Sequence, residues 1–190
     1  MASIVEQRAT ADDLLREEGK AELIGGRIVR YMASGHLPSV VAFEIALSLR
    51  DYAKRMGRGH AYADGIGFMV PELSSGRESF SPDASYYVGP LPARLMRFVE
   101  NPPTFAVEVR SENDYGKSAE VEMAAKRADY FAAGTLVVWD VDVLGGAEVV
   151  RKHDKGGGAD TPVAVFRRGD TADAEPAVLG FTMPVDDLFE

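Results

Sequence analysis

Hydrophobic and polar positions alternate along the chain with two periods, one typical of strands and one of helices. Apolar runs predict strands at residues 21–31, 61–70, 82–88, 104–110, 136–141, 147–151 and 163–167. The Gly25-Gly26 pair divides the first of these into a tight hairpin. Helical spacing predicts helices at 11–18 (with Thr10 as N-cap), at 39–56 and within 112–133, with Gly57 and Gly134 at the ends of the longer two.

The order of these elements indicates the fold class. Strand, helix and strand follow one another over residues 104–141, which predicts a parallel crossover and therefore a mixed sheet. Residues 73–79 and 90–103 are expected to be connections, the second with at most one helical turn, and 184–190 a closing turn or short helix. The 190 residues contain no internal repeat or second core, so we expect one α/β domain over 1–190, a mixed sheet flanked by helices.

Composition excludes several classes of protein. The chain has no cysteine, and its three histidines (His36, His60 and His153) are far apart, which excludes a disulfide framework and the usual zinc spacings. Residues 1–10 lack the pattern of a signal peptide, and no apolar run approaches the roughly 20 residues of a membrane span. A cytoplasmic protein is expected.

The formal charge of −9 argues against broad binding to nucleic acid. A local basic stretch at Arg50, Lys54, Arg55 and Arg58 softens that argument. Its simpler interpretation is a solvated helix end, where cations favour the negative end of the helix dipole.

Two acids on apolar strands are the strongest candidates for chemistry. Asp83 follows a proline at the start of one strand, and Glu108 lies in the middle of another. A carboxylate in an apolar strand is costly unless a cation meets it. If the strands are neighbours, both acids can reach one point and bind a hard ion such as Mg²⁺. A strand-start turn at Asp83 and an ion pair between Glu108 and Arg110 remain the structural alternatives.

The order of motifs resembles the Uma-type family of putative restriction endonucleases, within the PD-(D/E)XK nuclease superfamily. Glu22-Leu23-Ile24-Gly25 resembles the opening hairpin of that family, and Ser81-Pro82-Asp83 its S-P-D motif. The remaining matches are 34–36 before the long helix, 105–109, Glu122, Lys126, Tyr130 and Gly134 spaced four apart, Val138-Trp139 with Asp142, and 187–189. Each motif is weak alone, but seven occur in the right order.

The resemblance implies a restriction-endonuclease-like core and a metal-dependent endonuclease. It implies a Mg²⁺ or Mn²⁺ site at Asp83 and Glu108, with the Val109 carbonyl as a further ligand and Glu22 as a further acid. The catalytic lysine would be Lys126 on the helix, which leaves Arg110 as a bystander or a phosphate contact. DNA as the substrate and a homodimer as the assembly also follow from the resemblance.

Structural alternatives stand beside these assignments. Lys126 has Glu122 and Asp129 within one helical turn, so a surface ion pair is a rival. An apolar stripe is expected along the helix at Val121, Ala124, Ala125, Ala128 and Ala132, with Lys126 beside a second stripe of Met123, Tyr130 and Phe131. Glu22 can be an ordinary exposed strand residue, and His36 a helix residue with no chemistry. Tyr130 and Trp139 are expected in the core or a pocket wall. An inactive binding protein and a hydrolase of another phosphoester are the alternative functions.

Overall fold

The computed structural model describes residues 7–144 and 146–189. A six-stranded mixed sheet forms its centre, in the order β11-β10-β9-β8-β6-β3. The strands are β3 (His60–Ala63), β6 (Ala84–Tyr87), β8 (Phe105–Val109), β9 (Val137–Val141), β10 (Glu148–Asp154) and β11 (Ala164–Arg167). Only β8 and β9 run parallel, joined through a helix, so the predicted crossover and the mixed sheet are confirmed.

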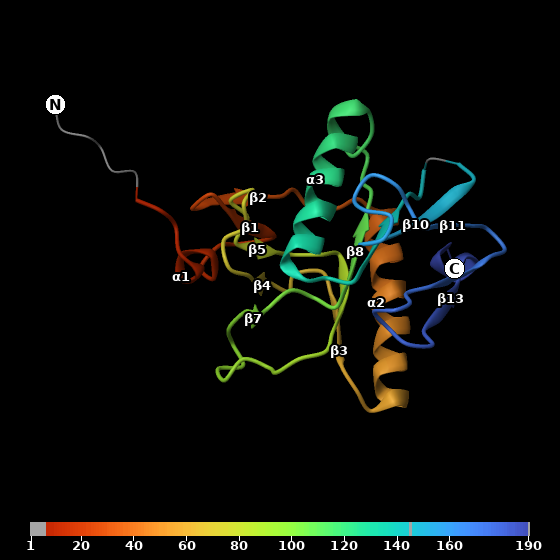
Figure 1. Cartoon of the computed structure of the whole chain (residues 1–190), viewed down its shortest axis with the longest axis horizontal. Helices are drawn as coiled ribbons and strands as arrows, with labels where there is room; N and C mark the ends of the chain where they lie inside the picture. The colour runs from red at the N-terminus through yellow and green to blue at the C-terminus, as the bar shows by residue number, and fades with distance from the viewer. Residues whose placement is uncertain (1–6, 145, 190) are drawn as a thin grey trace.

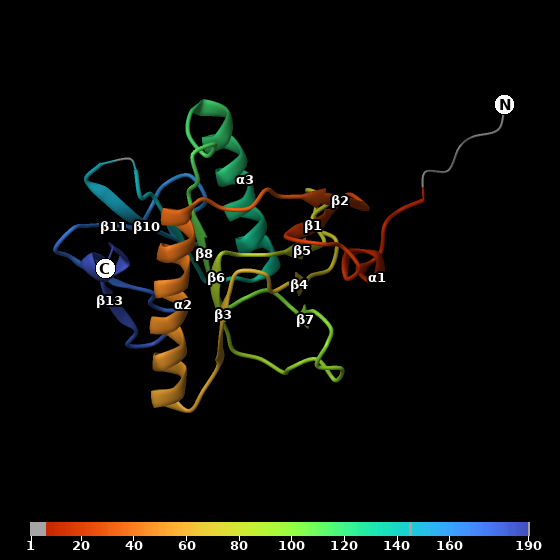
Figure 2. The same ribbon diagram turned by 180° about the vertical axis from the view of Figure 1, so that it is seen from behind.

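Two long helices cover opposite faces of this sheet, α2 (His36–Met56) and α3 (Lys117–Ala133). The helix α3 lies in front of the sheet in Figure 1, and α2 lies in front of it in Figure 2, which is the view from behind. Alternation along β8 assigns its side chains to the two faces: Phe105 and Val107 join the core under α2, while Ala106 joins the core under α3. Glu108 shares the α3 face because it is two residues beyond Ala106.

Smaller elements surround the central sheet. The hairpin of β1 (Ala21–Ile24) and β2 (Arg27–Arg30) turns at Gly25 and Gly26, which both have positive φ, as the Gly-Gly pair predicts. A three-stranded sheet joins β5 (Ser79–Phe80), β4 (Phe68–Met69) and β7 (Val99–Glu100), and β12 (Thr171–Asp173) pairs with β13 (Thr182–Pro184). The short elements α1 (Ala11–Leu14) and η1 (Val185–Phe189) lie near the two ends of the described chain.

Several predicted boundaries are wrong. The expected strand at 61–70 is two strands in different sheets, because Asp64 accepts the N–H of Gly65 (2.9 Å) and turns the chain between them. The expected connection 90–103 has no helical turn and contains the two-residue strand β7, and the two-residue strand β5 begins at Ser79, the last residue of the expected connection 73–79. The helix at 11–18 stops at Leu14, although Thr10 caps it as expected. Strands β12 and β13 were not expected.

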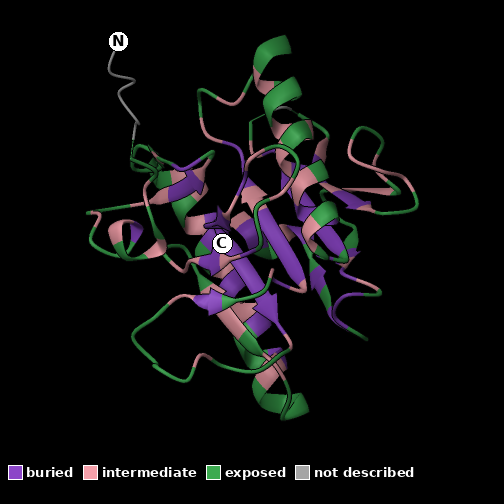
Figure 3. Cartoon of the chain, turned by 60° about the vertical axis from the view of Figure 1, so that its left-hand side comes forward, coloured by how far each residue is buried: buried purple, intermediate pink, exposed green. Residues whose placement is uncertain are grey.

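The predicted apolar stripe of α3 is also wrong. Val121 is 69% exposed, and Ala125, Ala128 and Ala132 are exposed as well. The buried side chains of α3 are Arg127, Tyr130 and Phe131, so the second stripe faces the sheet. Figure 3 shows the first turns of α3 standing beyond the buried strands. The rule that alanine indicates a core face fails here because the sheet beneath this helix carries polar side chains.

Two expectations fall partly outside the described residues. Residues 1–6 of the segment expected to lack a signal peptide, and Glu190 of the expected closing turn, are not described. In the part of the chain that the structure describes, no helix is both long enough and apolar enough to cross a membrane.

Candidate active site

Asp83 and Glu108 lie opposite each other on neighbouring antiparallel strands. The register of β6 and β8 pairs Ala84 with Val107, and the residues just beyond this pair are Asp83 and Glu108. Asp83 directly precedes the first residue of β6, and its N–H donates to the Val107 carbonyl (3.0 Å). The Oδ2 atom of Asp83 accepts the N–H of Val109 (2.7 Å). The predicted meeting of the two acids therefore has a structural basis in strand pairing.

Glu22 reaches the same place from β1 and is fully buried. Its Oε1 atom accepts the N–H of Ser81 (2.9 Å), and its Oε2 atom accepts the hydroxyl of Tyr31 (2.8 Å) and the guanidinium of Arg77. The alternative of an ordinary exposed strand residue is therefore wrong. Because every contact ties a different segment to this carboxylate, Glu22 fixes the hairpin against the strand that carries Asp83.

Lys126 lies between two of these acids. Its ammonium is 3.1 Å from Oε1 of Glu22 and 2.9 Å from Oε1 of Glu108. The rival ion pairs along the helix do not form: Asp129 binds Arg77 (2.8 Å), and Glu122 accepts the hydroxyl of Ser118 (3.4 Å). Lys126 is thus a residue of the candidate site and not of the helix surface.

Tyr130 completes this side of the site. Its hydroxyl donates to Oε1 of Glu108 (2.6 Å), and its ring stacks on Phe80 with centroids 4.1 Å apart. The Oε1 atom of Glu108 therefore has two donors, one from each of two turns of α3. Tyr130 was expected only in the core or a pocket wall, and its hydrogen bond adds a direct link to the acid.

Burial and neighbouring charges shift the pKa values of the site residues in opposite directions. Burial raises the pKa of Glu22, but Lys126, Arg77 and the donors of Ser81 and Tyr31 outweigh it and lower that pKa to about 2. Burial opposes the charge of Lys126, yet the two carboxylates hold its pKa above the ordinary value. The pKa of Glu108 is raised by burial and by Asp83, despite the opposing Lys126. Lys126 is therefore a permanent positive charge at neutral pH.

Sequence reasoning missed four partners of the site. Lys20 lies 2.5 Å from Asp83 and 3.0 Å from Asp64, and Arg77 links Glu22 to Asp129. Lys20 precedes Glu22 by two residues, the spacing that puts both on one face of an extended segment, and this signal could have found it. Arg77 and Asp129 have no such signal, because their contact joins a loop to a helix 52 residues away.

Arg110 belongs to a separate group of charges. It is 3% exposed, and its guanidinium donates to Asp140 (2.7 Å from both Nε and Nη2) and to Glu120. Arg127 also donates to Asp140 (2.9 Å). The ion pair between Glu108 and Arg110 does not form, and the structure gives Arg110 a bidentate structural partner.

The other sequence candidates are His36, the basic stretch and Trp139. His36 is exposed as the first residue of α2, two residues before Pro38, which lines the pocket beside Asp83. Lys54 and Arg55 occupy the last turn of α2, as the simpler interpretation of the basic stretch requires. Phe43 is the last residue of α2 that lines the pocket beside Asp83, so along the helix Arg50 lies about 10 Å and Lys54 about 16 Å beyond the pocket. Trp139 is buried and donates to the Asp173 carbonyl (3.0 Å).

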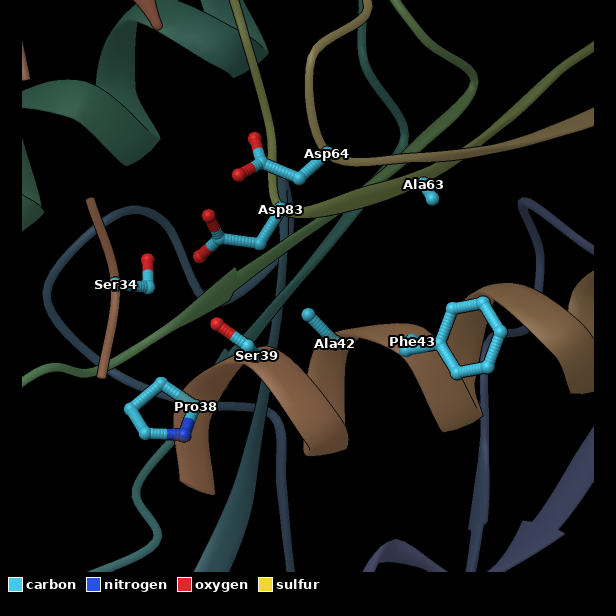
Figure 4. A pocket seen from close by; sticks show the side chains of 8 residues that line it. All are labelled: Ser34, Pro38, Ser39, Ala42, Phe43, Ala63, Asp64 and Asp83. Carbon is cyan, nitrogen blue, oxygen red and sulfur yellow. The ribbon is translucent and has the colours of Figure 1, made fainter. Parts of the chain in front are cut away.

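A pocket opens beside Asp83 on the α2 side of the sheet. Its walls are Ser34, Pro38, Ser39, Ala42, Phe43, Ala63, Asp64 and Asp83. Figure 4 shows the carboxylates of Asp64 and Asp83 reaching into the same space, with the hydroxyls of Ser34 and Ser39 below them. Asp83 therefore faces the buried charges of the site and an opening to the outside.

The ion-paired groups around the site carry more negative than positive charge. Five carboxylates meet three cations, which leaves a formal charge of −2. The carboxylates are Glu22, Asp64, Asp83, Glu108 and Asp129, and the cations are Lys20, Arg77 and Lys126. Within residues 7–144 and 146–189, no three His, Cys, Asp or Glu side chains are grouped as metal ligands. Any ion held here would thus take two carboxylates and other oxygens.

Comparisons with known proteins agree with this architecture. The chain matches a crystal structure described as a putative nuclease belonging to DUF820 from Anabaena variabilis, with a TM-score of 0.69 and 16% identity. The match covers 95% of this chain and 97% of the other, and at this identity it concerns the fold. No curated protein matched. The model of the Uma2 family, described as putative restriction endonuclease, matches residues 8–186. The chain therefore belongs to the Uma2 family of putative restriction endonucleases.

Proposed function

We propose that the chain is a metal-dependent endonuclease that hydrolyses phosphodiester bonds of nucleic acid, with DNA as the substrate. One observation carries the proposal: Asp83 and Glu108 oppose each other on paired strands, and the ammonium of Lys126 lies 2.9 Å from Glu108. Two acids and a lysine at one point suit a reaction that needs a cation, a water and a site for negative charge.

The residues fit a Mg²⁺ or Mn²⁺ ion. Val109 offers its N–H to Asp83, and because the N–H and carbonyl of a strand residue point to the same edge, its carbonyl lies on that edge too. Two carboxylates and a carbonyl suit Mg²⁺, which retains several waters. The formal charge of −2 around the site also favours a divalent cation. Such an ion, when bound, lowers the pKa of a water and polarises a phosphoryl oxygen.

The remaining residues position and charge the site. Lys126 is held between Glu22 and Glu108, so its ammonium stays protonated and can donate to the attacking water or to the phosphate. It is too strongly charged to act as a base. Glu22 fixes Lys126 in this position, and Tyr130 fixes the orientation of Glu108 through its hydroxyl. The pocket walled by Ser39 and Asp64 gives the substrate an approach to Asp83.

Cleavage of supercoiled plasmid DNA with Mn²⁺ tests the proposal. The variant Asp83→Asn keeps an oxygen that can accept the N–H of Val109 but loses the negative charge, so it should fold and be slower by at least about 100-fold. Asp51→Ala, which removes an exposed acid from α2, is the matched control and should cleave like the wild type. Equal cleavage by Asp83→Asn and the wild type would rule out this site.

The cellular setting and the assembly are part of the same proposal. We infer a cytoplasmic homodimer, because cutting both strands of a duplex requires two sites that face opposite strands. Sedimentation at increasing protein concentration tests the assembly, and a monomer at every concentration would contradict it.

A further inference from the structure

Lys20 binds the one oxygen of Asp83 that is free of backbone contacts. The Oδ2 atom of Asp83 already accepts the N–H of Val109, whereas the ammonium of Lys20 lies 2.5 Å from the Oδ1 atom. The side chain of Lys20 is only 16% exposed, so this contact is part of the packed structure. An ion that takes Oδ1 as a ligand would have to replace this ammonium.

Lys20 also has a second partner within reach. Its ammonium is 3.0 Å from Oδ1 of Asp64, whose side chain is 46% exposed and lines the pocket beside Asp83. Lysine carries its charge on a flexible stem of four carbons, so a short movement can shift the ammonium fully onto Asp64. Lys126 differs in this respect, because both of its partners, Glu22 and Glu108, lie inside the candidate site.

We propose that Lys20 is a resident counter-ion that occupies the cation position on Asp83 and yields it to a divalent ion by moving onto Asp64. The inference rests on the proposed function, since it takes Asp83 as a metal ligand. Lys20 would offset the repulsion between Asp83 and Glu108 and would compete with the incoming ion. Asp64 would be the acceptor of the displaced ammonium and not itself a ligand.

A double-variant cycle of Mn²⁺ affinity tests this arrangement. Titrations followed by the electron paramagnetic resonance signal of free Mn²⁺ would use the wild type, Lys20→Met, Asp64→Asn and the double variant. Removing the competing charge should tighten Mn²⁺ binding by about tenfold or more in Lys20→Met. Asp64→Asn should weaken binding in the wild type. In the Lys20→Met background the same change should have no effect, because Asp64 acts through Lys20.

Two controls separate this inference from the proposed function. Lys54→Met removes an exposed lysine at the far end of α2 and should leave Mn²⁺ affinity unchanged. Asp83→Asn should abolish binding with or without Lys20. Thermal melts of each variant show whether it is folded, and Lys20→Gln provides a second, polar replacement with the same expected tightening.

Each result of the cycle has one meaning. Equal or weaker Mn²⁺ affinity in folded Lys20→Met and Lys20→Gln would overturn the counter-ion, while the role of Asp83 as a ligand would stand. A loss of affinity from Asp64→Asn that persists without Lys20 would make Asp64 a direct ligand and would overturn the shift. If neither the wild type nor Lys20→Met binds Mn²⁺, both the proposed metal site and the proposed counter-ion role of Lys20 are ruled out.

Discussion

Two groups of buried charges lie on the α3 face of the sheet; β8 supplies Glu108 to one, and Arg110, directly after β8, belongs to the other. Glu108 belongs to the candidate site with Lys126, and Arg110 belongs to the second group with Asp140 and Arg127. The second group is balanced: two arginines meet Asp140 and Glu120. The candidate site has two more carboxylates than cations, and it adjoins a pocket.

This difference separates a structural ion network from a candidate for chemistry. The acceptor atoms of Asp140 face guanidinium groups whose planar shape fixes the geometry. Asp83 and Glu108 instead meet lysines, whose point charges leave more freedom, together with one backbone N–H for Asp83 and one tyrosine hydroxyl for Glu108. Buried charge alone therefore does not identify a functional site, whereas an excess of one sign beside an opening is a better indication.

The largest predicted effect compares two neighbours on one helix. Lys126→Met should slow DNA cleavage by about 100- to 1000-fold, because a donor to the reacting group is lost. Its loss of stability should be smaller than that of Arg127→Met, since Glu108 has a raised pKa and can take up a proton, and the buried Glu22 keeps its contact with Arg77. Arg127→Met should have a small effect on DNA cleavage and a large effect on stability. It leaves Asp140 with one arginine and should lower the free energy of unfolding by about 3 kcal/mol.

Single-turnover cleavage and urea unfolding of the same preparations measure both quantities. Cleavage by Arg127→Met should be compared at a temperature at which the variant is fully folded. A large loss of cleavage in folded Arg127→Met, or none in Lys126→Met, would remove the distinction between the two groups of charges.

The next prediction uses the acidity of Glu22. Its pKa in the folded protein is about 2, below the ordinary value, so its contribution to stability is present above about pH 4.5 and is lost as the pH falls toward 2. The full contribution is about 3 kcal/mol. Glu22→Gln should therefore be less stable than the wild type at pH 6, and the difference should shrink steadily in urea unfolding at lower pH.

The matched control for Glu22 is Glu112→Gln, an exposed acid whose replacement should change stability little at any pH. A constant difference between Glu22→Gln and the wild type from pH 6 to pH 3 would mean that lost packing, and not lost charge, explains the variant.

The sequence predicted the strands near Asp83 and Glu108, but not the contacts that join them to the other segments of the site. Asp83 and Glu108 were expected to meet only if their two strands were neighbours, and the pairing of β6 with β8 meets that condition. The contacts of Arg77 with Glu22 and Asp129 could not be predicted from the sequence, because they depend on how a loop passes under α3. The buried face of α3 was assigned wrongly because the aromatic rings of Tyr130 and Phe131, and not the alanines, pack against the sheet, together with the buried Arg127.

The role of Lys126 came from resemblance, and the geometry gives it a physical reason. Apolar periodicity leaves Lys126 off the expected apolar stripe, and its neighbours in sequence offered Glu122 and Asp129 as rival partners. The ammonium instead points to Glu22 and Glu108 because α3 lies with its polar side chains over β8. Long-range partners of a helix residue cannot be read from its neighbours in sequence.

The smallest expected effect on stability has the opposite sign from that of Glu22 and belongs to the same site. Because the pKa of Glu108 is raised, ionised Glu108 opposes folding at neutral pH, and this cost disappears below its ordinary pKa, where both states are protonated. Glu108→Gln should therefore raise the free energy of unfolding by about 1 kcal/mol at pH 7 while it abolishes cleavage. In urea unfolding at pH 4 the gain should vanish. A variant that is less stable than the wild type at pH 7 would show that Lys126 more than offsets the burial of Glu108, and the site would then resemble the balanced network around Asp140.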